Sequence, residues 1–138
     1  MKFPGQSHQE LTRAEEQVML VLWKIEKGVI HDILQRFPDP KPAYNTVSTI
    51  VRILEQKGFV NHKAYGRTYE YFPVVPRSDY TRQYLGNFLR NYFGNSFQSL
   101  ASFFAREEKP SLQELEELLK IINQEISNQQ NQQNQHHE

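Results

Sequence analysis

The sequence has no cysteine, no long apolar segment and no net charge. The absence of cysteine from all 138 residues excludes disulfide bonds, zinc sites with cysteine ligands and a thiol nucleophile. No segment approaches the roughly 18 consecutive apolar residues that a membrane-spanning helix needs. Residues 1–10 also lack the apolar centre of a secretory signal peptide. We therefore expect a cytoplasmic protein without membrane insertion.

Residue patterns that mark common catalytic and cofactor sites are also missing. There is no glycine-rich phosphate loop, no histidine pair at metal-binding spacing and no triad-like order of serine, histidine and aspartate. The five histidines are dispersed, at positions 8, 31, 62, 136 and 137. The acidic residues at positions 114, 116 and 117 fall on the outer face of an expected helix, where solvated charge is the ordinary interpretation. We therefore expect no enzyme, no metal site and no cofactor.

The balance of 16 basic and 16 acidic side chains conceals an uneven distribution. Residues 1–76 carry ten Lys and Arg against eight Asp and Glu, whereas residues 77–138 carry six against eight. Within residues 41–67, five basic side chains stand against Glu55 alone, which gives a local net charge of +4. Because charge contacts are short-ranged at physiological salt, such a cluster can bind phosphates even in a neutral protein.

Hydrophobic spacing in the first part of the chain predicts two helices. Thr12 can cap the first helix, and Glu15 can complete a capping box with it. We expect Lys27-Gly28 to end this helix. A second helix is expected over residues 31–37, because the three alternate prolines at 38–42 cannot continue it.

A third helix and a hairpin are expected next. The third helix spans residues 43–57, and its core-facing stripe has the helical spacing of Val47, Ile50, Val51 and Leu54. Residues 59–65 and 68–74 alternate in polarity and are rich in β-prone residues, with Gly66-Arg67 between them as a turn. Three helices followed by a β-hairpin is the order of a winged helix-turn-helix domain.

The remainder of the chain is expected to be helical, over residues 78–93, 96–105 and 111–127. The last of these helices has a coiled-coil-like seam of Leu112, Leu115, Leu119, Ile122 and Ile126. We predict a mainly α fold with three parts: a winged helix-turn-helix domain over residues 1–76, a helical dimerisation region over 77–127 and a disordered Gln/Asn-rich tail over 128–138. Residues 1–9 are expected to be a disordered lead-in.

The face of the third helix that lies opposite its core stripe carries short polar side chains. They are Asn45, Thr46, Ser48, Thr49 and Arg52. Short side chains let a helix approach base edges, threonine can offer its methyl group to thymine, and arginine can donate two hydrogen bonds to guanine or to a phosphate. The alternative is an ordinary solvated face, although such faces usually carry more Glu, Lys and Gln.

The predicted hairpin adds cations close to its turn. His62, Lys63 and Arg67 lie there, together with Tyr65 and Tyr69. Such a wing can reach phosphates or the adjacent minor groove. A basic surface turn without function is the alternative, but the two signals occur together at the spacing of a winged helix, so we expect binding to double-stranded DNA.

The C-terminal part has more large apolar side chains than three short helices can bury. They are Tyr80, Tyr84, Leu85, Phe88, Leu89, Tyr92, Phe93, Phe97, Leu100, Phe103 and Phe104. Burial of one such side chain stabilises by roughly 1.5–3 kcal/mol, so exposure of many is unfavourable and a two-fold partner would cover them. A ligand pocket between these helices is the alternative. The predicted dimer contacts are Tyr84, Phe88, Tyr92, Phe97, Leu100, Phe104, Leu115, Leu119 and Ile122.

Several segments resemble the BlaI/MecI/CopY repressor family. They are Leu11–Met19 with Leu22-Trp23, Ala43–Thr49, Leu54–Val60, and Gly66-Arg67 with Tyr69–Tyr71. The resemblance extends over about residues 10–125. It implies a homodimer on a palindromic operator that represses β-lactamase, penicillin-binding-protein or copper-export genes. It assigns DNA contacts to Tyr44, Asn45, Thr46, Ser48, Thr49, Arg52, Lys63 and Arg67.

The resemblance also bears on how repression would be relieved. Sensing of copper through a C-terminal cysteine cluster is excluded, because the chain has no cysteine. The β-lactam branch of the family implies cleavage in the dimerisation region under a membrane sensor protease of the BlaR/MecR type. The corresponding residues here are Phe103 and Phe104, for which packing in the dimer core is the interpretation we favour. A winged helix that binds a protein partner without operator binding is the alternative function.

Overall fold

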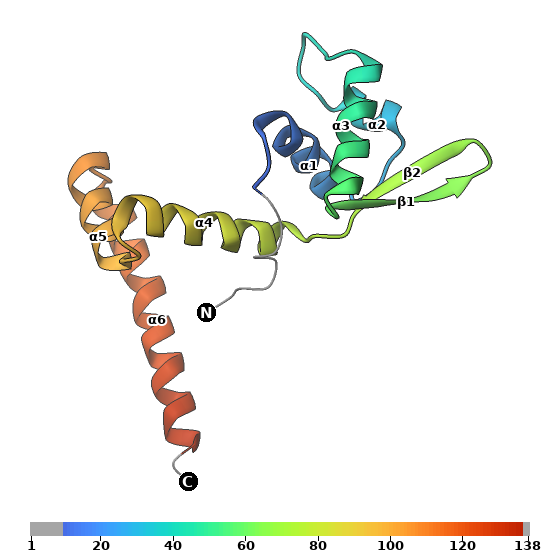
Figure 1. Ribbon diagram of the computed structural model, residues 1–138. Coiled ribbons are helices and arrows are strands. Elements are labelled where there is room, and N and C mark those ends of the chain that lie inside the picture. Colours follow the sequence, from blue (N-terminus) through green and yellow to red (C-terminus); the bar gives the residue numbers. More distant parts are fainter. Residues whose placement is uncertain (1–9, 137–138) are drawn as a thin grey trace. The chain divides into compact units, whose positions relative to one another are not determined.

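The computed structural model describes residues 10–136 and has the predicted order of three helices, a hairpin and further helices (Figure 1). The described residues form two compact units, the N-terminal unit up to Phe88 and the C-terminal unit from Leu89 onward. The winged-helix fold class is confirmed. The expected disorder of residues 1–9 and 137–138 falls outside the described residues.

Helix α1 (Arg13–Ile25) begins as the sequence predicted. The Thr12 hydroxyl accepts a hydrogen bond from the Glu15 backbone N–H at 3.2 Å, and the Glu15 carboxylate accepts one from the Thr12 N–H at 2.9 Å. This reciprocal capping box satisfies two backbone donors that the first helical turn would otherwise leave free. The helix ends at Glu26, which has a left-handed φ of 74° and donates its N–H to the Leu22 carbonyl.

Gly28 does not end α1, so that expectation was wrong. Its backbone pairs with Tyr71 through N–H to O distances of 2.9 and 2.8 Å, which adds a short antiparallel bridge beside the hairpin. A Cβ at this position would lie 2.9 Å from Ile25 Cδ1 and 3.1 Å from Asp32 Cβ. Glycine therefore permits close packing here, since a Cβ would force Ile25 and Asp32 to shift. The left-handed turn is made two positions earlier, at Glu26.

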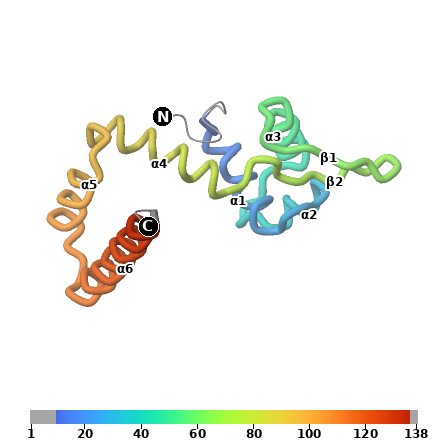
Figure 2. Tube along the Cα trace, turned by 90° about the horizontal axis from the view of Figure 1, so that it is seen from below, coloured from blue at the N-terminus to red at the C-terminus, as the bar shows by residue number. Residues whose placement is uncertain are grey.

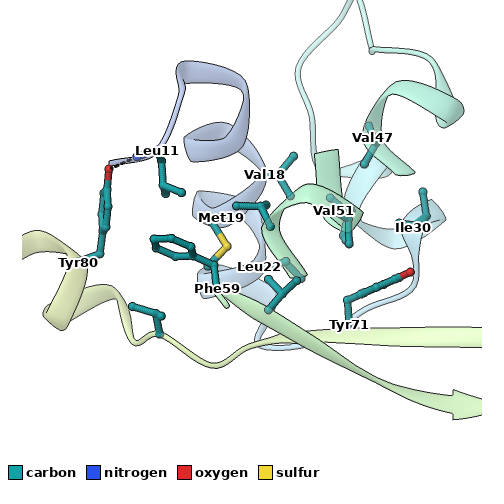
Figure 3. Packing of buried hydrophobic residues seen from close by; sticks show 14 residues of the cluster. Leu11, Val18, Met19, Leu22, Ile30, Val47, Val51, Phe59, Tyr71 and Tyr80 are labelled. Carbon is teal, nitrogen blue, oxygen red and sulfur yellow. Dashed lines mark hydrogen bonds between the residues drawn. The ribbon is translucent and has the colours of Figure 1, made fainter. Parts of the chain in front are cut away.

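The core of the N-terminal unit lies between α1, α2 (Ile30–Gln35) and α3 (Tyr44–Gln56). The predicted stripe of α3 faces this core, since Val47, Val51 and Leu54 are fully buried and Ile50 packs against them in part. Figure 3 shows Val47 and Val51 on the side of α3 that faces Val18 and Leu22 of α1, with Phe59 beside Met19. Burial of each large apolar side chain contributes about 1.5–3 kcal/mol to stability. This cluster therefore fixes the position of α3 against α1 and α2.

The wing is a hairpin of β1 (Val60–Tyr65) and β2 (Thr68–Pro73) in antiparallel register, with Tyr65 opposite Thr68. Gly66 has a φ of 62° in the two-residue turn between the strands, a conformation that glycine adopts without strain. Figures 1 and 2 both show the tip of this hairpin projecting away from α1, α2 and α3.

Helix α4 (Arg77–Phe93) begins inside the packing of the N-terminal unit. Tyr80 is buried, with ring centroids 5.8 Å from Trp23 and 5.9 Å from Phe59. Its hydroxyl accepts a hydrogen bond from the Leu11 N–H at 3.1 Å (Figure 3), and burial raises its pKa. The predicted domain boundary at residue 76 thus precedes a residue of the core, and the two units divide within α4.

The C-terminal unit continues with α5 (Phe97–Phe103), a π-helical turn (η1, Phe104–Glu108) and α6 (Leu112–His136). Ser96 caps α5 by accepting the Ser99 N–H. The structure places residues 128–136 in α6, whereas the sequence predicted a disordered tail from residue 128. Glutamine is a good helix former and no proline or glycine interrupts this segment, so nothing local stops the helix. Within the described residues, no helix is both long and apolar enough to cross a bilayer.

Candidate nucleic-acid interface

A groove of 370 Å³ lies between α3, the start of α2 and the wing. We call it the wing groove. Its wall on α3 is formed by Tyr44, Ser48 and Arg52, which are spaced by four residues and therefore lie in one row along the helix. Its wall on the wing includes Arg67 and Tyr69. The fold thus brings together four residues for which DNA contacts were predicted: Tyr44, Ser48, Arg52 and Arg67.

Two guanidinium groups give this groove its charge. Among residues 10–136, neither Arg52 nor Arg67 forms an ion pair, and both side chains are exposed. Guanidinium groups with free donors can bind phosphate oxygens or the edge of a guanine. The groove is therefore suited to an anionic polymer with flat hydrogen-bonding edges.

The other predicted contacts on α3 lie outside the groove. Asn45, Thr46 and Thr49 are exposed on the outward side of the helix. The Thr49 hydroxyl donates to the Asn45 carbonyl at 2.9 Å, so its oxygen keeps lone pairs available as acceptors. The predicted set is therefore divided between two neighbouring sides of α3, one of which also faces the wing.

The local basic cluster is smaller at the surface than the sequence indicated. Both carboxylate oxygens of Glu15 lie 2.8 Å from Lys57 Nζ, which ties α1 to the end of α3. Lys41 Nζ donates to the Phe37 carbonyl at 2.7 Å at the end of α2. Lys57 thus serves internal packing, whereas Lys41 stays exposed but is engaged with backbone carbonyls and Asp39. The three of the five cations whose side chains form no hydrogen bond or ion pair among the described residues are Arg52, Lys63 and Arg67.

The wing contributes aromatic side chains that were not predicted as site residues. Tyr71 lines the groove beside Tyr69, and Lys63 Nζ lies 5.4 Å from the centroid of the Tyr65 ring. Burial raises the pKa of Tyr71, and the charge of Glu55 raises it further, so its hydroxyl stays neutral at pH 7. The period of two in β2 places Tyr69 and Tyr71 on one face, a signal that could have found them.

The residues predicted for dimerisation are largely uncovered in a single chain. Exposed fractions reach 74% for Tyr92 and 68% for Phe97. The α6 seam is exposed along its length, from Leu112 to Ile126. Phe103 is exposed as well, although its ring contacts Phe93 edge-on at a centroid distance of 5.5 Å. No three His, Asp or Glu side chains of the described part of the chain gather as metal ligands would.

Three helices, a projecting two-stranded wing and a cationic groove between them define a winged-helix protein of the DNA-binding type. A model of the penicillinase repressor family matches residues 11–124. The chain belongs to this family, whose members are transcriptional repressors and not enzymes. The resemblance to BlaI/MecI/CopY repressors and the expectation of a non-enzyme are both confirmed.

Individual relatives align over most of their own length. The methicillin resistance regulatory protein MecI of Mammaliicoccus sciuri is 31% identical over 119 residues, which cover 83% of this chain and 94% of the relative. MecI of Staphylococcus aureus (strain N315) is 29% identical over 115 residues, with the same coverage. The penicillinase repressor of Bacillus licheniformis is 26% identical over 114 residues, which cover 82% of this chain and 89% of the relative.

Proposed function

We propose that this chain is a cytoplasmic homodimeric repressor that binds a palindromic DNA operator through α3 and the wing. The observation that carries the proposal is the wing groove, where Arg52 of the third helix and Arg67 of the hairpin present free guanidinium groups on either side. Membership of a repressor family supports the same function.

In this proposal α3 enters the major groove of the duplex. Asn45, Thr46 and Thr49 contact base edges, because short side chains on the outward side of the helix permit close approach. Arg52 reads a base or holds a phosphate, and Lys63 and Arg67 reach the backbone beside it. Phosphate contacts set the position of the protein, and base contacts select the sequence.

A second copy of the chain completes the operator complex. The aromatic side chains of α4 and α5 and the α6 seam leave apolar surface exposed in one chain, which supports their burial in a two-fold dimer. Two linked modules read half-sites about one helical turn apart, and linkage raises affinity through effective concentration.

Because operator binding in this proposal depends on the linkage of two modules in a dimer, loss of that linkage would relieve repression. The relatives are named for methicillin resistance and for penicillinase repression, and we extend control of a β-lactam resistance gene to this chain. Cleavage between Phe103 and Phe104, under a membrane sensor protease, would separate Phe104 and the α6 seam from the DNA-binding unit, weaken the dimer and so release the operator. Recovery of a fragment that ends at Phe103, from cells exposed to a β-lactam, is the expected sign of this route.

The test uses a duplex selected by the full chain from a random pool. We expect Arg52→Ala and Thr46→Ala to weaken binding about tenfold each, since one base or phosphate contact accounts for about 1–3 kcal/mol. The matched controls are Arg82→Ala and Thr81→Ala, both on exposed positions of α4. Affinity should be measured over a salt series, where a steep decline marks phosphate contacts.

Two results would count against this function. Unchanged affinity in both variants would remove α3 as the reading element. Failure of the wild-type chain to bind any duplex at low salt would favour the alternative, a winged helix that recognises a protein partner.

A further inference from the structure

We infer that Glu55 and His62 form a positioning pair that fixes the wing against α3 and so holds Arg67 in place for DNA contact. This inference rests on the proposed function and assigns a role to two residues that do not themselves need to touch DNA. It concerns the contact between the end of the reading helix and the first strand of the hairpin.

The pair is a direct hydrogen bond between the two elements. Glu55 lies in the last turn of α3, and its carboxylate binds Nδ1 of His62 on β1. Both side chains are partly shielded, with 32% of Glu55 and 29% of His62 exposed. A bond with limited solvent access loses less to competition with water, and this one holds whether His62 is neutral or charged, since Nδ1 can donate in both states.

The ring of His62 also joins the two strands of the wing. It stacks on Tyr69 at a centroid distance of 4.2 Å and an interplanar angle of 17°, and it meets Tyr71 at 5.6 Å. In the register of the hairpin His62 is opposite Tyr71, and Tyr69 is the diagonal neighbour on β2. Glu55 is therefore connected through one imidazole to both strands.

The rest of the hairpin has little else to orient it. Its base is held by buried Val60 and by the Gly28 bridge to Tyr71, whereas residues 63–69 are all exposed. An isolated two-stranded ribbon is only marginally stable in water. Without the pair, the segment that carries Lys63 and Arg67 would pivot about its base.

Glu55 also lies next to Arg52, one of the two arginines of the wing groove. It follows Arg52 by three residues, so the two side chains are neighbours on α3. A carboxylate so close to a DNA-binding arginine repels phosphates, and its removal should by charge alone strengthen binding. The positioning role predicts instead that removal of this carboxylate weakens binding. The measured affinity therefore distinguishes the charge effect from the positioning effect.

The first measurement uses the free full chain and needs no DNA. In Glu55→Ala and His62→Ala, amide hydrogen exchange over residues 63–68 should be at least fivefold faster than in wild type. Glu55→Gln keeps an oxygen acceptor and should restore the wild-type rate. His62→Phe keeps the stack but lacks Nδ1 and should behave like Glu55→Ala. Glu70→Ala is the matched control, because that carboxylate is on the same hairpin and has no hydrogen-bond or ion-pair partner among the described residues.

The second measurement is affinity for the duplex selected from a random pool. Glu55→Ala should weaken binding about fivefold, while Glu70→Ala should leave it unchanged or tighter. In an Arg67→Ala background the Glu55→Ala change should have little further effect, because the contact that the pair positions is already gone. Thermal unfolding of each variant verifies that the core remains folded.

Equal exchange rates in Glu55→Ala and wild type would overturn the inference, and so would unchanged or tighter binding by Glu55→Ala. Full additivity with Arg67→Ala would overturn it too, because the pair would then act elsewhere. A wild-type chain that binds no duplex would instead overturn the proposed function, and the role in DNA contact would fall with it.

Discussion

Glu15 is a carboxylate that the fold removes almost entirely from water, with 4% of the residue exposed. Burial by itself raises its pKa, but the hydrogen bonds from Lys57 and Thr12 and the charge of Lys57 lower it by more. The net effect holds the pKa of Glu15 below its ordinary value of 4.5. The ionised form is therefore the one that stabilises the N-terminal unit.

This shift has a defined pH dependence. Because the pKa of Glu15 is lower in the folded state than in the unfolded chain, its contribution is fully present above about pH 4.5 and is lost as the pH falls through the folded-state value. We expect Glu15→Gln to lower the free energy of unfolding at pH 7 by about 1.5–3 kcal/mol, the range for hydrogen bonds to charged groups. Urea unfolding at pH 7 and at pH 4 measures both effects.

The control for Glu15 is its neighbour Glu16, which is half-buried and has no ion-pair or hydrogen-bond partner for its carboxylate among the described residues. Glu16→Gln should keep most of the wild-type stability and its acid dependence. If Glu15→Gln lost stability equally at both pH values, the ionised pair with Lys57 would not be the source of the effect.

At the scale of elements, the wing depends on its turn. Gly66 has a φ of 62°, where a side chain with a Cβ is strained. Gly66→Ala should destabilise the hairpin by about 1–2 kcal/mol, whereas Gly66→Asn should cost less because asparagine tolerates this conformation. Amide exchange of β1 and β2 is the measurement. Equal exchange in the alanine and asparagine variants would show that the backbone conformation of the turn is not what limits the wing.

Most elements could be predicted because their signals are local. The Thr12 and Glu15 capping box, the alternate prolines and the apolar stripe of α3 each act within a few residues, and the observed bounds are within two residues of those expected. The end of α6 could not be predicted, because low-complexity composition suggested disorder while glutamine permits a helix. The end of α1 depended on the left-handed Glu26, a position that glycine usually takes.

At the scale of the whole molecule, the division between the units determines which fragment can fold. A fragment of residues 1–88 keeps Tyr80 with its contacts to Leu11, Trp23 and Phe59. We expect it to be folded, monomeric and weak in duplex binding, because the α6 seam is absent. A fragment of residues 1–76 lacks Tyr80 and should be less stable by about 3–5 kcal/mol, as for loss of a large core side chain. Sedimentation and thermal unfolding test both fragments.

A dimeric 1–88 fragment in sedimentation would contradict the need for α5 and the α6 seam, because Tyr84 and Phe88 are the only proposed dimer contacts that it keeps. Equal stability of the two fragments would contradict the inclusion of the first turn of α4 in the core. The two measurements therefore examine the dimer proposal and the boundary between the units separately.

By itself, the sequence determined the winged-helix order, the core face of α3 and the polar side chains opposite it, because periodicity and capping are read within one segment. Only the tertiary structure decided which cations are free, since Lys57 is paired with a residue 42 positions away. It also decided that Tyr71 lines the wing groove and that Glu55 binds His62 across the contact between α3 and the wing. Contacts between segments that are far apart in the sequence depend on how the core packs. A local sequence pattern carries no information about them.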